Sequence, residues 1–446
     1  MLNRHARSAR SWLTWNSAGY AALFGRVVIG TGLVTASVLA TTTLSASAAS
    51  QARPGAVSFP GVLEAVTCTS PVDCWAVGDG GPAGTTLNQV LHWGGAMWSQ
   101  VTVPSPAGGG SGDFNQLSSV RCLNPDDCWA VGFSRAAGNA QNTQALHWNG
   151  KRWKVIATPD PGGVATNSFS YLTDVSCTSA KNCWAVGNDG LFVSNVSNQV
   201  QRRVNLVLRW NGTKWSQTKV PNPAGTGMND GNFLNAVRCT SASNCWAAGD
   251  FGPIGDTPHL RNLLLRWNGT KWKTASVPNP GGTGAGDDNE IKALSCASAS
   301  NCWATGVFGR ISPDLNRTMG LDELLHWNGR SWSKATAPNP GGTSGDSLNE
   351  LDAVTCSSAV NCWATGEFGG NGSNPARNLA VRWNGKKWQK AGTPNPAGTG
   401  TGDVNDLLGV RCTSSSNCFA VGEAFTVGLP TVDEILHWNG RKWQVS

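Results

Sequence analysis

The sequence has 446 residues, of which 14% are charged, and it contains 22 Trp, 55 Gly and 22 Pro but only 2 Tyr. Its length alone would suggest two or three domains, and its Gly and Pro content favours short strands joined by turns over long helices. Four arginines and no acid lie in the first 50 residues, so the remainder has 30 basic and 27 acidic residues, a net charge of +3. That charge is too small for a polyanion binder, and we expect no nucleic-acid partner.

Residues 1–48 have the organisation of a signal peptide. The arginines precede an apolar stretch at residues 27–44, and Ala46-Ser47-Ala48 supplies the small residues of a cleavage site. An uncleaved membrane anchor is the alternative, but the stretch is rich in Thr, Gly and Ser and would span a bilayer poorly. We therefore expect a secreted, extracellular or cell-surface protein without a membrane span in its mature chain. The expected organisation is a signal peptide at 1–48, an N-terminal extension at 49–61 and a repeat region at 62–446.

Fourteen cysteines fall in seven pairs, each with five residues between its two members. A fully paired count behind a signal peptide predicts disulfides formed in an oxidising compartment. Zinc binding is the alternative, although zinc sites favour closer spacing and a histidine ligand. The expected bridges are Cys68–Cys74, Cys122–Cys128, Cys177–Cys183, Cys239–Cys245, Cys296–Cys302, Cys356–Cys362 and Cys412–Cys418.

Each cysteine pair belongs to one copy of a motif of roughly 55 to 60 residues, and the fourth copy shows its parts. Apolar runs at 234–239, 245–249 and 263–267 predict three strands, and Trp272 marks a fourth. Asn268-Gly269 between the last two runs is a strong hairpin signal. Seven such copies predict an all-β fold, a seven-bladed β-propeller of four-stranded antiparallel blades with one disulfide per blade.

Tryptophans of the third and fourth strands are expected to pack between blades. If Asn149-Gly150 forms a two-residue turn, Leu146 lies opposite Trp153 and Trp148 opposite Lys151, all on one face. A sugar-stacking platform is the alternative for these indoles. The ring is expected to close by packing of the first blade against the last, helped by residues 56–59 as an added strand.

The order of these strands resembles the kelch and galactose-oxidase type of propeller. The second strand ends in Gly, as in Ala76-Val77-Gly78, and a Trp in the fourth strand precedes a Pro/Gly loop. The chain looks closest to cysteine-containing repeats of secreted actinobacterial proteins, over about residues 62–446. It has one Gly where kelch has two, and it lacks the kelch tyrosine. The resemblance implies the fold and does not imply an activity.

The copper chemistry of galactose oxidase is not expected, and no catalytic residue is assigned. That chemistry needs several tyrosines and a Tyr–Cys crosslink, whereas residues 49–446 contain only Tyr171 and every cysteine is paired. Four histidines share one repeat position with three arginines, which indicates a structural role. These residues are His92, His147, His326, His437, Arg209, Arg266 and Arg382.

Acidic residues on three consecutive copies form the candidate ligand site. In a propeller, the variable connections gather on one face, which we call the loop face, and ligands usually bind there. The acids close to the axis on this face are Glu290, Glu350, Asp406, Glu367 and Glu423. They could bind a cation, of which calcium is the candidate, or supply an acid–base pair for polysaccharide cleavage. Solvated loop carboxylates without a function are the alternative, and the metal content stays open.

An Asp-x-Asn pattern recurs in the connections between copies, where it predicts either Asx turns or weak sugar or calcium sites. It comprises Asp113/Asn115, Asp230/Asn232, Asp287/Asn289, Asp346/Asn349 and Asp403/Asn405.

We expect a monomeric, non-enzymatic binding module that recognises a glycan, a cell-wall polymer or a cell-surface protein through its loop face. One alternative is an extracellular polysaccharide-cleaving enzyme, a glycoside hydrolase or lyase, that uses the acidic cluster. Another is a purely structural surface scaffold.

Overall fold

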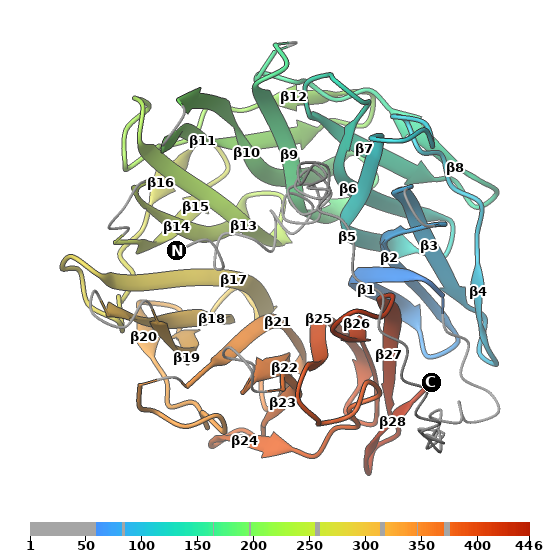
Figure 1. The fold of residues 1–446 in the computed structure, drawn as a ribbon, viewed down its shortest axis with the longest axis vertical. Coiled ribbons are helices and arrows are strands. Elements are labelled where there is room, and N and C mark those ends of the chain that lie inside the picture. Colours follow the sequence, from blue (N-terminus) through green and yellow to red (C-terminus); the bar gives the residue numbers. More distant parts are fainter. Residues whose placement is uncertain are drawn as a thin grey trace, which may run out of the picture. The chain divides into compact units, whose positions relative to one another are not determined.

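The computed structural model describes residues 59–82, 85–163, 165–195, 198–254, 259–312, 317–345, 347–369 and 375–446. These residues form seven blades of four antiparallel strands around one axis (Figure 1). The described part of the chain contains no helix, so no helix there could cross a membrane. The predicted all-β, seven-bladed fold is confirmed. The expected signal peptide lies outside the described residues.

The four strands of a blade follow one another in sequence, from the axis outward. The first strands are β1 (Gly61–Ser70), β5 (Phe114–Asn124), β9 (Ser168–Ser179), β13 (Asp230–Ser241), β17 (Asp287–Ser298), β21 (Asn349–Ser358) and β25 (Asp403–Ser414). The second strands are β2 (Asp73–Gly80), β6 (Asp127–Arg135), β10 (Asn182–Asn195), β14 (Asn244–Pro253), β18 (Asn301–Ser312), β22 (Asn361–Phe368) and β26 (Asn417–Thr426).

The third strands are β3 (Leu87–Trp93), β7 (Asn142–Trp148), β11 (Asn198–Trp210), β15 (Arg261–Trp267), β19 (Arg317–Trp327), β23 (Arg377–Trp383) and β27 (Val432–Trp438). The fourth strands are β4 (Trp98–Gln100), β8 (Trp153–Ile156), β12 (Trp215–Gln217), β16 (Trp272–Thr274), β20 (Trp332–Lys334), β24 (Trp388–Ala391) and β28 (Trp443–Val445).

One disulfide closes the hairpin between the first and second strands of every blade. All seven predicted pairs are present, for example Cys68–Cys74 and Cys239–Cys245, each with its Cα atoms 4.0 Å apart. The remaining bridges have the same arrangement. The pairing prediction is therefore confirmed, and such a set of bridges suits an oxidising environment. These hairpins and the turns between third and fourth strands define the turn face, opposite the loop face.

The turn between the third and fourth strands differs from the prediction. Trp148 pairs directly with Trp153, so the connection has four residues, and the predicted pairing of Trp148 with Lys151 is wrong. The reason is an Asx turn: Asn149 Oδ1 accepts hydrogen bonds from the backbone N–H groups of Lys151 and Arg152. The Gly that follows Asn has a φ of 81° at Gly150, which favours glycine there.

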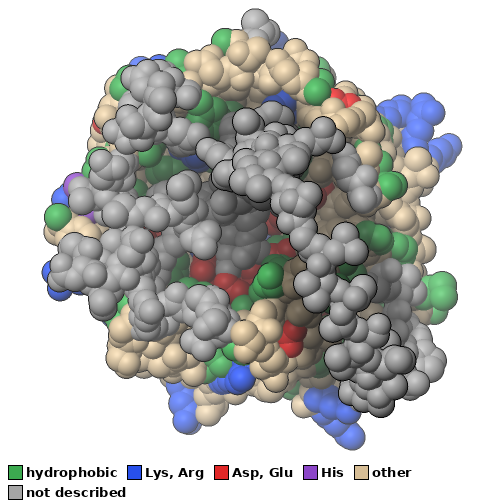
Figure 2. Space-filling model, viewed as in Figure 1, with side chains coloured by type: hydrophobic (Ala, Val, Ile, Leu, Met, Phe, Trp, Pro, Cys, Tyr) green, Lys and Arg blue, Asp and Glu red, His purple; other side chains and the backbone are tan. Residues whose placement is uncertain are grey.

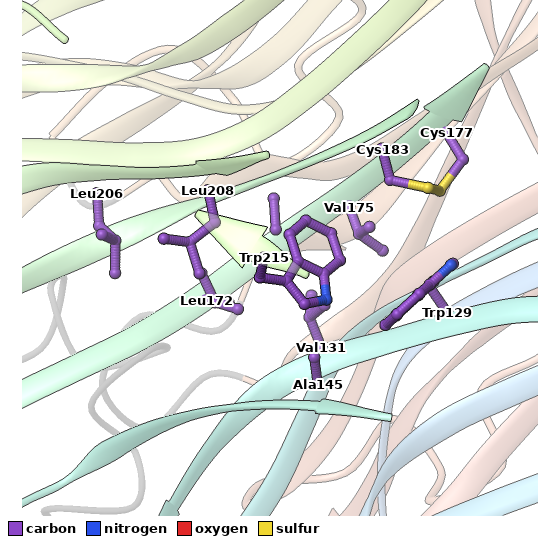
Figure 3. Close-up of a cluster of buried hydrophobic side chains, with 11 residues drawn as sticks. Trp129, Val131, Ala145, Leu172, Val175, Cys177, Cys183, Leu206, Leu208 and Trp215 are labelled. Atoms are coloured by element: carbon purple, nitrogen blue, oxygen red, sulfur yellow. A yellow bond between two sulfur atoms is a disulfide. The ribbon is translucent and has the colours of Figure 1, made fainter. Parts of the chain in front are cut away.

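Tryptophans pack between neighbouring blades, as predicted. Trp129 in β6 contacts Trp210 and Trp215 of the following blade, and its ring centroid lies 4.8 and 5.1 Å from theirs. Figure 3 shows Trp129 and Trp215 within this cluster of buried apolar side chains. The same grouping recurs at the other interfaces. Two indoles and one strand-two ring therefore recur in the apolar cluster between adjacent blades, together with aliphatic side chains such as Leu172 and Leu208.

The position shared by histidine and arginine has the structural role expected of it. His92 stacks on Trp75 with ring centroids 4.3 Å apart, and Arg209 lies 5.2 Å above the ring of Trp184. His92 Nε2 also lies 2.7 Å from Asp73 Oδ1. Either side chain covers the strand-two ring with a flat polar group.

The ring closes by packing of the first blade on the seventh. Leu63 and Val66 of β1 share an apolar cluster with Phe419 of β26, which contacts Trp93 and Trp98 at 5.3 Å each. This is the same grouping that joins the other blades, with Phe in place of Trp. Of the expected added strand, residues 56–58 lie outside the described residues. The Phe59 carbonyl accepts a hydrogen bond from the backbone of β27.

Candidate functional site

The seven first strands, which are the innermost strands of their blades, line an axial channel. At the loop face each first strand carries one residue whose carbonyl oxygen is covered by the glycine of the second strand. A Cβ on Gly306 would lie 1.9 Å from the Glu290 oxygen, and one on Gly366 would lie 2.1 Å from the Glu350 oxygen. A register shift follows directly in each first strand. Glycine is therefore required to bring the strands together where the candidate residues lie.

The predicted acids lie on strands at this loop-side mouth, and four of the five are almost fully enclosed. Asp406 is 0% exposed, Glu367 3%, Glu423 5% and Glu350 9%, while Glu290 is partly exposed. These four acids are buried on β-strands. The alternative of solvated loop carboxylates therefore does not describe them. Figure 2 shows acidic side chains in the hollow at the centre of the ring.

Two of these acids face like-charged partners across a strand pair. Glu350 of β21 lies opposite Glu367 of β22, and Asp406 of β25 lies opposite Glu423 of β26. Like charges in directly opposed positions destabilise a sheet unless a proton or a cation compensates them. The mouth over blades five to seven therefore holds two directly opposed pairs of carboxyl groups.

An internal lysine supplies part of the compensation, and sequence reasoning missed it. Lys292 of β17 forms an ion pair with Glu350 and a second with Asp352, at 2.8 Å from Nζ to Oδ1. The lysine thereby joins blades five and six. The sequence does contain a signal for Lys292: it is the only basic residue at its repeat position, where the other first strands carry Glu, Ser, Thr, Asn, Asp or Leu.

Further buried acids on the third strands belong to a hydrogen-bond ladder between blades. Asn262 donates to Glu323 Oε1 at 2.5 Å, Asn378 donates to Glu434, and Gln89 donates to Asp433 at 3.0 Å. In the second blade, Gln144 takes the place of the glutamates and forms two hydrogen bonds with the Asn88 side chain, one in each direction. The ladder includes the interface between the first and seventh blades.

Burial raises the pKa of several acids of the third strands, and of Asp79 in β2. It raises the pKa of Asp322 and of Asp433 to about 8, and that of Asp79 to about 7. Burial also raises the pKa of Glu323 and Glu434 well above the ordinary value, and neighbouring carboxylates add to the effect. These raised pKa values favour the protonated form of Asp322, Asp433, Glu323 and Glu434 near neutral pH, which reduces their repulsion with neighbouring carboxylates.

The Asp-x-Asn pattern forms the connections between blades. Asn289 is fully buried; its amide donates to the carbonyl groups of Leu260 and Gly282, and its Oδ1 accepts from Gly281 N–H. Asp287 Oδ2 accepts from Gly284 N–H at 2.8 Å. Equivalent bonds occur at Asn115, Asn232, Asn349 and Asn405. Of the two interpretations left open, these bonds support a structural role. They are not Asx turns, because each side-chain oxygen accepts from a residue three or eight positions earlier in the chain. Asp346 lies outside the described residues.

Aromatic side chains and one arginine gather on blades three and four. Arg203 of β11 lies 5.2 Å from the ring centroids of both Phe169 and Phe233, and its Nη1 donates to the Tyr171 hydroxyl at 2.9 Å. Tyr171 and Phe233 hold the positions that Glu290 and Glu350 hold on other blades. Blades three and four thus add aromatic rings and a buried cation to the mouth. The acids extend into blade four, because Asp250 lies opposite Phe233, is 2% exposed and has a pKa raised by burial and by the neighbouring Glu290.

Comparisons with known proteins agree on the architecture. No family model and no curated protein matches the sequence. In structure the chain is similar to a GH74 xyloglucanase from Xanthomonas campestris, with 15% identity and a TM-score of 0.51, over 88% of this chain and 55% of that one. It thus matches about half the length of that enzyme.

Two further structures show weaker likeness. The β-propeller domain of the Trilobed protease from Pyrococcus furiosus has 7% identity and a TM-score of 0.44, covering 86% of this chain and 97% of that one. Chaetomium thermophilum Sqt1 has 12% identity and a TM-score of 0.39, covering 83% and 96%. These likenesses concern the fold alone. The chain is a β-propeller with a disulfide in each of its seven blades.

Proposed function

We propose that this protein is a secreted, non-enzymatic and monomeric binding module whose ligand site is the acidic loop-side mouth on blades five to seven. Glu290, Glu350, Asp406, Glu367 and Glu423 provide its negative field. The ligand class that fits such a field is a glycan or cell-wall polymer with amino groups, because a cationic group gains most from enclosed carboxylates. We also propose that the propeller is of the kelch-like type and that residues 1–48 are cleaved off as a signal peptide.

We propose binding and not catalysis because most of these acids are buried. A glycosidase needs two carboxyl groups that reach the scissile bond, one as acid and one as base or nucleophile. Glu350, Glu367, Asp406 and Glu423 are at most 9% exposed. Built into the walls in this way, they act on a ligand through their charge.

Calcium is kept as a bridging ion within the proposal, and it is not assigned to a site. Among the described residues, no group of three or more His, Cys, Asp or Glu side chains is arranged to hold a metal ion.

Retention of the mature chain on three polymers tests the proposal. Chitosan carries amino groups, chitin has the same backbone with those groups acetylated, and polygalacturonate carries carboxylates. We expect retention on chitosan, weaker retention on chitin and none on polygalacturonate, with added salt reducing the first. Equal retention on all three would contradict the proposal.

The residues are tested with the triple variant Glu290→Gln, Glu350→Gln, Asp406→Asn. It should lose at least about tenfold in chitosan affinity, equivalent to ~1.4 kcal/mol. Asp126→Asn is the control, because Asp126 is an exposed acid on the turn face. Full retention of the triple variant would remove these acids from the site.

A further inference from the structure

Three arginines occupy equivalent positions near the turn-face end of the axial channel. Arg121, Arg238 and Arg411 each stand directly before the first cysteine of their blade, on blades two, four and seven. They are therefore two, three and two blades apart around the ring. All three line one cavity of about 150 Å³, to which every first strand contributes. At roughly 30 Å³ per water molecule, that is the space of about five waters.

Among the acids, Asp174 is the one whose charge acts on these guanidinium groups, at Arg238 and Arg121. The Nε atoms of Arg121, Arg238 and Arg411 are shielded from solvent and make no hydrogen bond within the described part of the chain. Burial lowers the pKa of Arg121 well below its usual value, and repulsion from the other two adds to this. Burial lowers the pKa of Arg411 to about 10, again with a contribution from Arg238. Arginine nonetheless stays charged at neutral pH, so the repulsion is present in the folded protein.

The nearby acids are engaged elsewhere. Asp174 accepts hydrogen bonds from Ser119 Oγ at 2.7 Å and from the backbone N–H groups of Val175 and Val237 at 2.8 Å each. Asp352 pairs with Lys292, and Glu64 accepts from Gln116 at 2.7 Å. Asp174 is the acid whose charge reaches Arg238 and Arg121. The cavity lining thus holds four cations, the three arginines and Lys292, against three acids, Glu64, Asp174 and Asp352. The oxygens of Asp174 already have three donors.

We propose that this arginine cluster is a second ligand site, which binds a tetrahedral oxyanion as free phosphate or sulfate or as the terminal group of a larger molecule. Three guanidinium groups around one axis can donate to several oxygens of such an anion at once. The site lies at the opposite end of the channel from the acidic mouth, and it is independent of the glycan proposal.

The repeat itself supplies matched substitutions. The same position is threonine or serine on the other four blades: Thr67, Ser176, Ser295 and Thr355. A change of arginine to threonine is therefore compatible with the blade. In buffer without phosphate or sulfate, Arg121→Thr and Arg411→Thr should leave the unfolding temperature unchanged or raise it, because each relieves repulsion from Arg238. Arg238→Thr also removes the cation that acts on Asp174, so its unfolding temperature should be the lowest of the three.

Thermal unfolding in a phosphate series, with chloride added to constant ionic strength, tests the site. We expect the unfolding temperature of the wild type to rise with the logarithm of phosphate concentration. Each single variant should weaken the apparent phosphate affinity about tenfold or more, and the triple variant should show no response. Glucose 6-phosphate and sulfate complete the series: tighter binding of the sugar phosphate would identify the terminal group of a larger molecule as the source.

The control is the triple variant Arg152→Thr, Arg330→Thr, Arg441→Thr, which removes three exposed arginines from the turns between third and fourth strands. It should keep the full phosphate response. No phosphate effect in the wild type, or the same effect in wild type and the Arg121/Arg238/Arg411 variant, would overturn the proposal. Chitosan retention should survive in this variant, which separates failure of this site from failure of the acidic mouth.

Discussion

Single polar side chains at the blade interfaces determine how the protein responds to pH. Asp322 and Asp433 occupy a third-strand position that is asparagine on four other blades, and Glu323 and Glu434 occupy one that is glutamine on two. The amides fill these positions without a charge. In the acids, burial favours the protonated form, although the hydrogen bonds that Glu323 and Asp433 accept favour the charged form. Sequence alone could not show this, because the bonds join residues about sixty positions apart, such as Asn262 and Glu323.

We predict that the protein loses stability as pH rises from about 4 to about 8. The pKa of Asp322 and of Asp433 is about 8 in the folded protein, against the ordinary value of 3.8 expected in the unfolded chain. Between these values, the unfolded chain releases protons that the folded protein retains. The free energy of unfolding must therefore fall across this range. The unfolding temperature, measured at fixed ionic strength, should be higher at pH 5 than at pH 8. In a propeller of this length, each kcal/mol lost corresponds to about 1 °C.

The variant Asp322→Asn, Asp433→Asn, Glu323→Gln, Glu434→Gln checks the cause. These residues recur naturally at the same positions on other blades, so the variant should fold and show a flatter pH profile. An unchanged slope would place the pH dependence in other groups.

At the scale of the element, the interface between blades is a repeated unit of three aromatic side chains. Trp246 is 1% exposed and contacts Trp327 and Trp332 of the next blade at 5.0 and 5.4 Å. Phe419 fills the corresponding position on the last blade at comparable distances. The strand order and the indole packing were predictable because they recur in every copy. The turn register was not, since the four-residue Asx turn contains the same Asn-Gly pair as a two-residue turn.

We therefore predict a graded response at Trp246. Replacement by alanine should cost about 3–5 kcal/mol through the lost contacts and the cavity left behind. Replacement by phenylalanine should cost much less, because the chain already uses that residue at one interface. Differential scanning calorimetry measures both, with Met97→Ala as control because Met97 is 64% exposed. Equal destabilisation by Ala and Phe would show that the indole itself is required.

At the scale of the whole molecule, seven similar blades form a ring whose channel has chemically different ends. The acids of blades five to seven were found from the sequence because they interrupt a repeat at the loop face. Lys292 and the three arginines interrupt it too, at positions 292, 121, 238 and 411, yet their importance depends on which side chains reach the axis. Repetition therefore reveals where blades differ, and only the three-dimensional arrangement shows which differences meet.

Hydrogen exchange of the mature chain with and without a saturating chitosan oligosaccharide tests the central claim, that the ligand site is the acidic loop-side mouth, most directly. We predict slowed exchange in the loop-face ends of β17, β21 and β25, and in the connections next to Glu290 and Glu350. Exchange at the disulfide hairpins of the turn face should not change. Protection confined to those hairpins or to the outer fourth strands, or no protection at all, would contradict the proposed binding site.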